Sequence, residues 1–273
     1  MKTAQLKRSS HIVISGGGSG LGFGLASRYL KRGMMVTILD LAIAQERKKT
    51  LDQLASQHGA KWQFLKTDIT KADTVNVNIE KAISVFGKIS LAINSAGVII
   101  NKLLGETSPE DFKRVIDINL NGSFNFASAV LPTMQKGARL ALISSMAGIV
   151  SNYAYSAYGA SKFGVIGLAT TLRYEYEHKG IAISCVCPPE VETPMVSEER
   201  LHGNKVSLAM KKFGGTMQAD EACDGIMAGL DAGKWMIIPS LNAKVLAASA
   251  RLLPTAFFNL SQQIIKYTEK KYS

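Results

Sequence analysis

The amino-acid sequence predicts a doubly wound α/β fold, in which helices cover both faces of a parallel sheet. Short β-branched runs alternate with amphipathic segments of helix length through most of the chain. A glycine-rich turn separates the first expected strand from the first expected helix. Because βα units joined by right-handed crossovers form a parallel sheet, this order favours one. No repeat or proline-rich linker interrupts the order, so we expect a single domain.

The elements are expected in regular alternation along the chain. The strands, each short and rich in β-branched residues, are expected over 11–15, 34–40, 61–67, 88–94, 139–144 and 181–187. The helices, each with apolar residues at helical spacing, are expected over 20–33, 44–58, 72–86, 109–135 and 155–178.

The net charge of +11 raises the question of a nucleic-acid partner. The excess of Lys and Arg lies near the two ends of the chain, and no groove-reading element accompanies it. We therefore expect a solvated basic surface and no nucleic-acid partner.

Several features predict a soluble protein of the cytoplasm. No stretch approaches the roughly 20 uninterrupted apolar residues of a spanning helix, and the apolar run 12–14 is far too short for a signal peptide. The cysteines Cys185, Cys187 and Cys223 leave an odd thiol in any pairing, so we expect reduced core residues. The histidines lack metal-ligand spacing, and no metal is predicted.

The glycine-rich turn predicts a dinucleotide site. Glycines let the backbone approach a pyrophosphate, which the N–H groups and dipole of a helix N-terminus attract. A flexible loop has the same composition, but the order of strand, turn and helix favours a dinucleotide site. The residues expected to contact the cofactor here are Gly16, Gly18, Ser19, Gly20, Leu21 and Gly22.

Asp40 ends the second expected strand, where a carboxylate accepts hydrogen bonds from the adenosine ribose hydroxyls. The same charge repels a 2′-phosphate, and neither Ser19 nor Leu41 supplies a balancing cation. NAD is therefore favoured over NADP. We assign Arg47 and Lys48 to the solvated face of the next helix.

Residues after the third and fourth strands lie at the same sheet edge as the glycine turn. They are Asp68, Ile69, Asn94, Ala96 and Gly97. Asp and Asn commonly end strands for reasons of turn chemistry, but in company with the glycine turn we expect these residues to line the cofactor site.

A catalytic group is predicted from residues that follow the fifth strand. Tyr158 and Lys162 are four residues apart on an expected helix and so share a face. A tyrosine can act as a base if a nearby cation lowers its pKa. Ser145 ends the fifth strand, and its hydroxyl can donate to a substrate oxygen. Asn119 is a polar side chain among apolar neighbours on the long helix and requires a partner.

Over about residues 10–240 the chain resembles the short-chain dehydrogenase/reductase family, which implies a Rossmann fold. The matching motifs are Gly16-x-x-x-Gly20-x-Gly22, Asn94-x-Ala96-Gly97, Asn119, Ser145 and Tyr158-Gly-Ala-Ser161-Lys162. The resemblance implies that Tyr158 is the general acid/base and that Ser145 orients the substrate oxygen. It also implies that Lys162 binds the nicotinamide ribose and lowers the tyrosine pKa, while Asn119 holds a water of the proton relay.

The segment 188–218 follows the sixth strand, at the edge where ligands bind in such sheets. It carries Met195, Met210, Phe213 and Met217 among charged residues and several glycines. This composition suits a substrate lid, and an ordinary surface loop is an equal alternative.

The start of that segment departs from the family pattern, because Pro188-Pro189-Glu190 stands where the family usually has Pro-Gly. Pro189 makes the loop stiffer than glycine would. Val191 and Thr193 are kept, and the resemblance implies that they contact the nicotinamide. The Pro-Pro-acid form is similar to a branch of 3-ketodihydrosphingosine reductases, which act on lipids at membranes with NADPH.

Residues 241–273 are expected to form a helical extension of the domain 1–240, not an independent domain. Apolar residues recur at Leu246, Leu253, Phe257, Leu260 and Ile264, with basic residues between them. The segment could pack on the enzyme or another subunit, cover the substrate site, or lie on a bilayer. We favour packing on the protein.

The expected function is NAD-linked hydride transfer between cofactor and an apolar secondary alcohol or ketone, in a homodimer or homotetramer. One alternative is an NADPH-dependent lipid ketoreductase with peripheral membrane contact. Another is a non-catalytic dinucleotide sensor, which would be expected to lose Tyr158 or Lys162.

Overall fold

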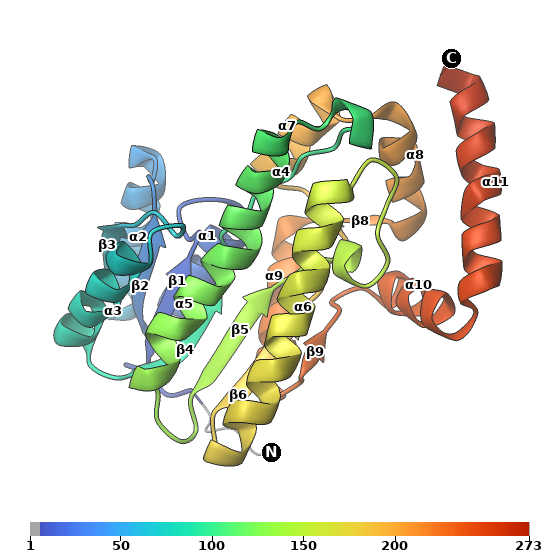
Figure 1. Ribbon diagram of the computed structural model, residues 1–273. Helices are drawn as coiled ribbons and strands as arrows, with labels where there is room; N and C mark the ends of the chain where they lie inside the picture. The colour runs from blue at the N-terminus through green and yellow to red at the C-terminus, as the bar shows by residue number, and fades with distance from the viewer. Residues whose placement is uncertain (1–5, 273) are drawn as a thin grey trace.

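The computed structural model describes residues 6–272, except for the side chains of residues 212–214, and Phe213 therefore lies outside the described side chains. Its central sheet has seven parallel strands in the order β3-β2-β1-β4-β5-β6-β9 (Figure 1). The strands are β1 His11–Ser15, β2 Met35–Asp40, β3 Lys61–Lys66, β4 Ile89–Asn94, β5 Arg139–Ile143, β6 Ala182–Val186 and β9 Met236–Ile237. A separate pair, β7 Glu190–Val191 and β8 Thr216–Met217, is also parallel.

Helices cover both faces of the sheet, which confirms the doubly wound fold in one domain. Those that pack on the sheet or follow its strands are α1 Gly20–Lys31, α2 Gln45–His58, α3 Ala72–Phe86, α4 Pro109–Ile116, α5 Gly122–Val130, α6 Ser156–Tyr176 and α9 Ala219–Asp231. The helices α3, α5 and α6 bury one apolar layer against the sheet, and α1, α2 and α9 bury the other. The strand residues alternate between these layers, as in Leu140 and Ala141 of β5.

The long helix expected over 109–135 is interrupted. The structure divides it into α4, a π-helical turn at Asp117–Asn121, and α5. The Ser123 hydroxyl donates to the Asn119 carbonyl at 2.5 Å, and the Asn119 side chain reaches Val98 across the chain. Such single-turn bulges are frequent at functional sites, and hydrophobic periodicity alone does not reveal them.

Two helices, α7 Pro194–His202 and α8 Lys205–Gly214, lie over the carboxyl ends of the strands (Figure 1). We call the segment 188–218, which includes them and the β7–β8 pair, the lid segment. It is largely helical rather than a loop, and it contains a short parallel strand pair. Its first residues are fixed to the β5 side of the sheet, since the Met146 N–H donates to Pro188 O at 2.9 Å.

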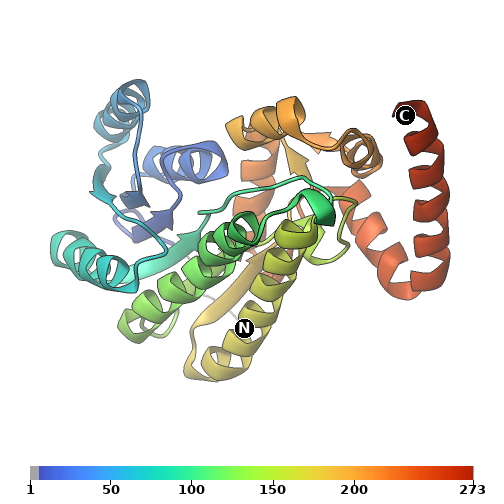
Figure 2. The same ribbon diagram turned by 45° about the horizontal axis from the view of Figure 1, so that its top comes forward.

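The last helices, α10 Leu241–Leu252 and α11 Pro254–Tyr272, form what we call the C-terminal arm. The arm extends outward from β9, and α11 turns back to pack on α8 (Figure 2). Tyr153 also holds α11, since its hydroxyl donates to Glu269 Oε1 at 2.7 Å. No helix within residues 6–272 is both long and apolar enough to cross a membrane.

Candidate active site

The turn after β1 is shaped by glycines that no other residue could replace. Gly16 has a φ of +67°, and a Cβ there would lie 2.5 Å from the Ala96 nitrogen. A Cβ on Gly22 would lie 2.2 Å from the Gly16 carbonyl oxygen. Ser19 precedes α1 without a side-chain cap, so the helix begins with N–H groups free to meet an anion. The turn therefore fits a pyrophosphate.

Asp40 lies beside this turn, at the end of β2. Its Oδ2 accepts a hydrogen bond from the Gly18 N–H at 2.8 Å, and its Oδ1 accepts one from the Leu41 N–H at 2.7 Å. Two strong backbone donors therefore orient the carboxylate at the mouth of the crevice. A carboxylate held here is the group that an adenosine ribose would meet.

Arg47 does not lie on a solvated face, and the prediction from the sequence is wrong here. It is half-buried, and its Nη1 donates to the Gly18 carbonyl at 2.8 Å. Its guanidinium lies 5.7 Å from the centroid of the Phe23 ring. The structure thus places a cation at the glycine turn, where Gly18 also bonds Asp40, and residue spacing did not indicate this.

The catalytic residues expected from the sequence converge at the carboxyl end of β5. Lys162 Nζ lies 5.6 Å from the Tyr158 ring centroid and donates to the Ile143 carbonyl at 3.1 Å. The Ser145 side chain is hydrogen-bonded to Tyr158. The turn that carries Ser145 packs closely on α6, since a Cβ on Gly148 would lie 2.5 Å from the Lys162 carbonyl oxygen.

Burial determines the protonation of this pair. It raises the pKa of Tyr158 to about 12, against the opposing effect of the hydrogen bond with Ser145. It lowers the pKa of the Lys162 ammonium to about 8. Burial thus keeps the Tyr158 pKa above its usual value, whereas the family resemblance implies that Lys162 lowers it. The phenol is the stable form near neutral pH.

Asn119, in the π-helical turn, joins neighbouring segments of the site by hydrogen bonds. Its Oδ1 accepts from the Val98 N–H at 2.8 Å, and its Nδ2 donates to Val98 O at 2.9 Å and to Ser161 Oγ at 3.0 Å. The side chain is therefore fully bonded to the protein. It connects the segment after β4 to α6, one turn of which carries Tyr158 and Lys162.

Asn94 lies beneath the site and also joins separate segments by hydrogen bonds. It is 1% exposed, accepts a hydrogen bond from Ser15, and donates to Ser123 Oγ at 2.7 Å. Asp68 also has a local role, since it accepts from the N–H and hydroxyl of Thr70 at 2.9 and 2.7 Å. Unlike Asn94, Asp68 still borders the cavity.

One continuous cavity of about 1570 Å³ joins these parts. Most residues expected from the sequence border it, namely Gly16, Ser19, Gly20, Leu21, Asp40, Asp68, Ile69, Ala96, Gly97, Ser145, Tyr158, Lys162, Val191 and Thr193. Four other expected residues do not border the cavity, namely Gly18, Gly22, Asn94 and Asn119. Among the described residues no group of three or more His, Cys, Asp or Glu could hold a metal ion.

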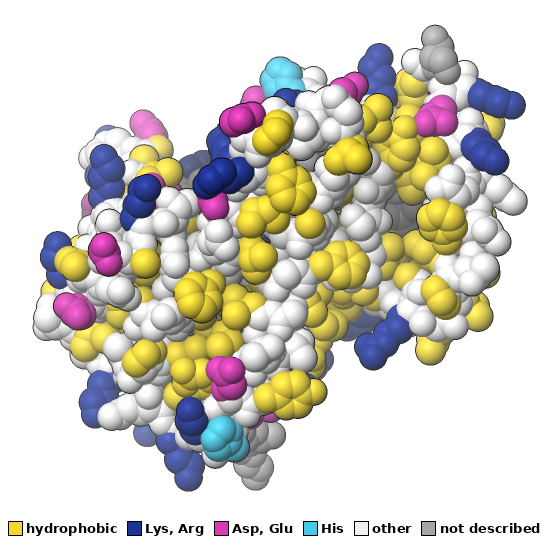
Figure 3. Space-filling view, in the orientation of Figure 1, with side chains coloured by type: hydrophobic (Ala, Val, Ile, Leu, Met, Phe, Trp, Pro, Cys, Tyr) yellow, Lys and Arg dark blue, Asp and Glu magenta, His cyan; other side chains and the backbone are white. Residues whose placement is uncertain are grey.

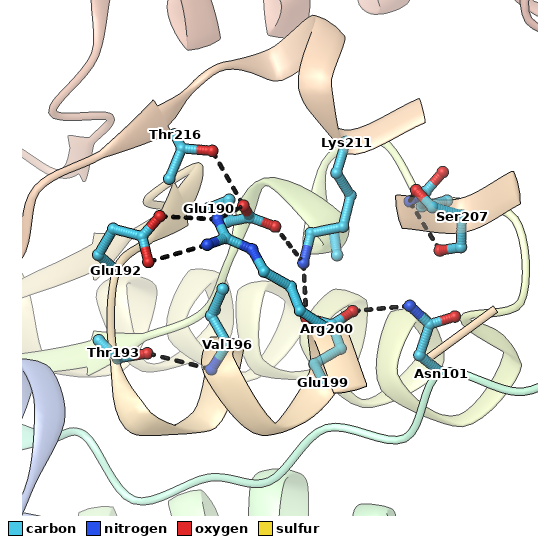
Figure 4. Close-up of polar contacts among 12 residues, drawn as sticks. Asn101, Glu190, Glu192, Thr193, Val196, Glu199, Arg200, Ser207, Lys211 and Thr216 are labelled. Atoms are coloured by element: carbon cyan, nitrogen blue, oxygen red, sulfur yellow. Dashed lines mark hydrogen bonds and ion pairs between the residues drawn. The ribbon is translucent and has the colours of Figure 1, made fainter. Parts of the chain in front are cut away.

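The lid segment contributes a buried carboxylate that the sequence analysis missed. The Glu199 side chain of α7 is 1% exposed. Its Oε1 accepts from Asn101 Nδ2 at 2.7 Å and from the Tyr155 hydroxyl, and its Oε2 lies 2.5 Å from Lys211 Nζ of α8 (Figure 4). These residues come from distant parts of the chain, so no spacing in the sequence could have pointed to them.

Glu190, from the unusual Pro-Pro-acid motif, completes this network. Its Oε2 lies 2.5 Å from Lys211 Nζ, it pairs with Arg200, and it accepts from Thr216 Oγ1 at 2.9 Å (Figure 4). Arg200 also pairs with the more exposed Glu192 at 2.8 Å. Residue 190 therefore ties α7, α8 and β8 together, which explains an acidic residue at this position.

The network reaches Tyr158 through Tyr155. The rings of Tyr155 and Tyr158 meet edge to face, with centroids 5.2 Å apart. Burial is the main cause of the raised Tyr158 pKa, and the negative charge of Glu199 raises it further. The lid segment is thus coupled to the Tyr158 phenol both by packing and by charge.

Comparisons with known proteins agree with this geometry. The model of the short chain dehydrogenase family matches residues 10–203. The 3-dehydrosphinganine reductase TSC10B of Arabidopsis thaliana is 36% identical over 234 residues, which are 83% of this chain and 69% of that protein. The 3-oxoacyl-(acyl-carrier-protein) reductase FabG of Chlamydia muridarum is 33% identical over 186 residues, which are 67% of this chain and 74% of that protein.

A similar fold is found among solved structures. A short chain dehydrogenase/reductase from Burkholderia phymatum, in complex with NAD, has a TM-score of 0.76 at 22% identity. The match covers 90% of this chain and 96% of that one. The likeness extends over nearly the whole sheet and its helices.

Replacing Glu199 by Gln tests the coupling between the lid segment and Tyr158. Removing the negative charge lowers the Tyr158 pKa, so the phenolate needed for alcohol oxidation forms at lower pH. We expect the acid limb of kcat/KM against pH to move down by roughly half a pH unit.

Glu192→Gln is the matched control, because Glu192 pairs with Arg200 in the same network without contacting Tyr155. Both substitutions can loosen the lid segment, but only the first changes the charge near the phenol. Equal pH profiles for the two variants would contradict the coupling.

Proposed function

Since the chain belongs to the short-chain dehydrogenase/reductase family, whose members are nicotinamide-dependent oxidoreductases, we propose that it interconverts an apolar secondary alcohol and its ketone with NAD(H). One observation carries the proposal. Tyr158, Lys162 and Ser145 border the same cavity as the glycine turn and Asp40. An acid/base group and a dinucleotide cradle therefore share one crevice.

The residues divide the chemistry between them. A bound nicotinamide accepts the hydride in alcohol oxidation and supplies it in ketone reduction. Tyr158 takes the hydroxyl proton in the first direction and returns it to the alkoxide oxygen in the second. Ser145 donates a hydrogen bond to the same oxygen, and Lys162 supplies a positive charge that favours the phenolate.

Burial adapts Tyr158 to the reducing direction. With a pKa of about 12, the side chain holds its proton at neutral pH and can give it to a developing alkoxide. Oxidation requires the phenolate, which forms more readily as pH rises. We therefore propose that ketone reduction extends to lower pH than alcohol oxidation does.

Tyr158→Phe tests whether the chain is a catalyst. We expect kcat to fall by about 10²–10⁴-fold, because the proton donor is lost, while NADH binding followed by fluorescence survives. Tyr174→Phe, an exposed position on the same helix, is the control. Undiminished turnover in Tyr158→Phe would remove the assignment of Tyr158 as the acid/base group. NADH binding without any turnover by the wild type would favour the dinucleotide-sensing alternative.

We propose NAD(H) as the preferred cofactor, with the pyrophosphate at the glycine turn and the adenosine ribose at Asp40. Asp68, Ile69, Ala96 and Gly97 border the crevice beside it. Val191 and Thr193 border it from the lid segment. The half-buried Arg47 supports the rival, an NADPH-dependent ketoreductase, because a guanidinium at the glycine turn could meet a 2′-phosphate.

Titration with NADH and with NADPH decides which of the two cofactors the protein prefers. We expect wild-type protein to bind NADH more tightly than NADPH, and Asp40→Asn to reduce that difference by about ten-fold. Arg47→Gln serves as the comparison and should leave NADH affinity nearly unchanged. Tighter NADPH binding by the wild type, lost in Arg47→Gln, would establish the rival cofactor.

We also propose a cytoplasmic homo-oligomer, with a catalytic domain of residues 1–240 and a helical extension of residues 241–273. The cysteines Cys185, Cys187 and Cys223 are buried and free, which supports a reducing compartment. The inner face of the extension packs on α8, in agreement with the preference for packing on the protein.

Peripheral membrane contact is a second candidate role for the C-terminal arm. Leu241, Val245 and Leu252 recur at helical spacing along α10 and are 74%, 62% and 76% exposed. Lys244 and Arg251 follow the same repeat and are also exposed. An exposed apolar stripe bordered by basic residues suits an anionic bilayer surface.

Vesicle co-sedimentation tests this contact. We expect more protein to sediment with vesicles that contain phosphatidylserine than with phosphatidylcholine alone, and the double variant Leu241→Asp, Val245→Asp to lose this binding. Val77→Asp, an exposed apolar position on α3, is the control. Sedimentation that is independent of lipid charge and unaffected by the double variant would exclude the role.

A further inference from the structure

The cavity that holds Tyr158 does not end at the catalytic group. Beyond it, the walls are formed by Met146, Ile149 and Val150 after β5 and by Met195 and Met210 of the lid segment. The cavity then continues along the C-terminal arm, as the hollow between the body and the last helices shows (Figure 3). An apolar passage thus leads from the acid/base residue to α10 and α11.

The arm presents an uncharged face to this passage. Its residues that border the cavity are Ala243, Leu246, Ala250, Pro254, Phe257, Phe258, Leu260, Ser261, Gln262, Ile264 and Ile265. The basic residues of the arm, Lys244, Arg251, Lys266, Lys270 and Lys271, are all exposed, and none of them borders the cavity. The described part of the arm therefore keeps its basic side chains away from the cavity, which its uncharged residues border.

Two of the lining side chains lack apolar cover. Phe258 is 61% exposed and Leu260 is 58% exposed, although both border the cavity. Removing such surface from water is favourable. An apolar group that extends from the catalytic site along α11 would cover them.

The arm is held firmly enough to act as a wall. Thr268 of α11 is buried, and Tyr153, which also borders the cavity, holds Glu269 by a hydrogen bond of 2.7 Å. The lining positions from Pro254 to Ile265 extend over roughly 16 Å of helix, the length of an extended alkyl chain of about a dozen carbon atoms. The shape suits a long, narrow occupant.

We infer that the C-terminal arm and the lid segment form a binding channel for an unbranched alkyl chain, and that the arm determines how long a chain the enzyme accepts. The inference rests on the proposed function, because the carbonyl carbon of that chain lies at Tyr158. The family match ends at residue 203, so the shared motifs do not include this wall. A second copy of the chain or a bilayer would cover Phe258 and Leu260 without filling the passage to Tyr158.

Methyl ketones of graded length test the channel. With NADH, the wild type should show kcat/KM that rises from 2-hexanone to 2-dodecanone. Ser261→Phe places a ring in the passage and should lower kcat/KM for 2-dodecanone by about ten-fold relative to 2-hexanone. Gln263→Phe, exposed on the same helix and outside the cavity, is the control and should keep the wild-type profile.

A second variant tests the channel independently, in case Ser261→Phe fails to fold. Ala250→Phe fills the passage from α10 and should give the same loss for long chains, with thermal unfolding checked for each protein. If both variants lower kcat/KM equally for every ketone, or if the wild type shows no dependence on length, the channel does not hold an alkyl chain.

Binding separates this inference from the proposed activity. In a Tyr158→Phe background, calorimetric titration with 2-dodecanone should give an affinity that Ser261→Phe weakens by about ten-fold and Gln263→Phe leaves unchanged. That result supports the channel even if no ketone is turned over by the wild type. Equal affinities in the three proteins overturn the channel, even if the enzyme proves active on short ketones.

Discussion

The site depends on the burial of a phenol beside an ammonium group at the carboxyl end of the sheet. Burial moves the pKa of Tyr158 up to about 12 and that of Lys162 down to about 8. The two pKa values move apart, because burial disfavours the charged form of each group. Both shifts require dry surroundings, to which the close packing of Gly148 on α6 and the bonding of Asn119 to Val98 contribute.

The lid segment adds a second buried charge to the same surroundings. An isolated carboxylate as deeply buried as Glu199 would be very costly, and only the combined contacts of Lys211, Tyr155 and Asn101 offset that cost. Loss of Lys211 would leave the buried carboxylate without its positive partner, and loss of Tyr155 or Asn101 would remove one of its hydrogen bonds. The network therefore favours one arrangement of α7 and α8 over the crevice, and through Tyr155 that arrangement influences the Tyr158 phenol.

The C-terminal arm has two apolar faces with different neighbours. One face borders the cavity, whereas the other, along Leu241, Val245 and Leu252, meets solvent in the isolated chain. A helix with apolar residues on opposite sides is expected between two apolar surroundings. The arm thus lies between the cavity and the surroundings of its outer face. This arrangement suits an enzyme that takes up the apolar substrate proposed above.

The sequence by itself determined the strand and helix alternation, the glycine turn, Asp40 and the Tyr158–Lys162 pair, because local periodicity and fixed spacing express these features. Only the tertiary structure brought Glu199, Lys211, Tyr155 and Asn101 together, since residues far apart along the chain leave no periodic signal. It also folded Arg47 onto the glycine turn, against the solvated face that helical spacing indicated. The π-helical turn at Asp117–Asn121 was equally hidden, and its Asn119 side chain is bonded to Val98 and Ser161, which are distant along the chain.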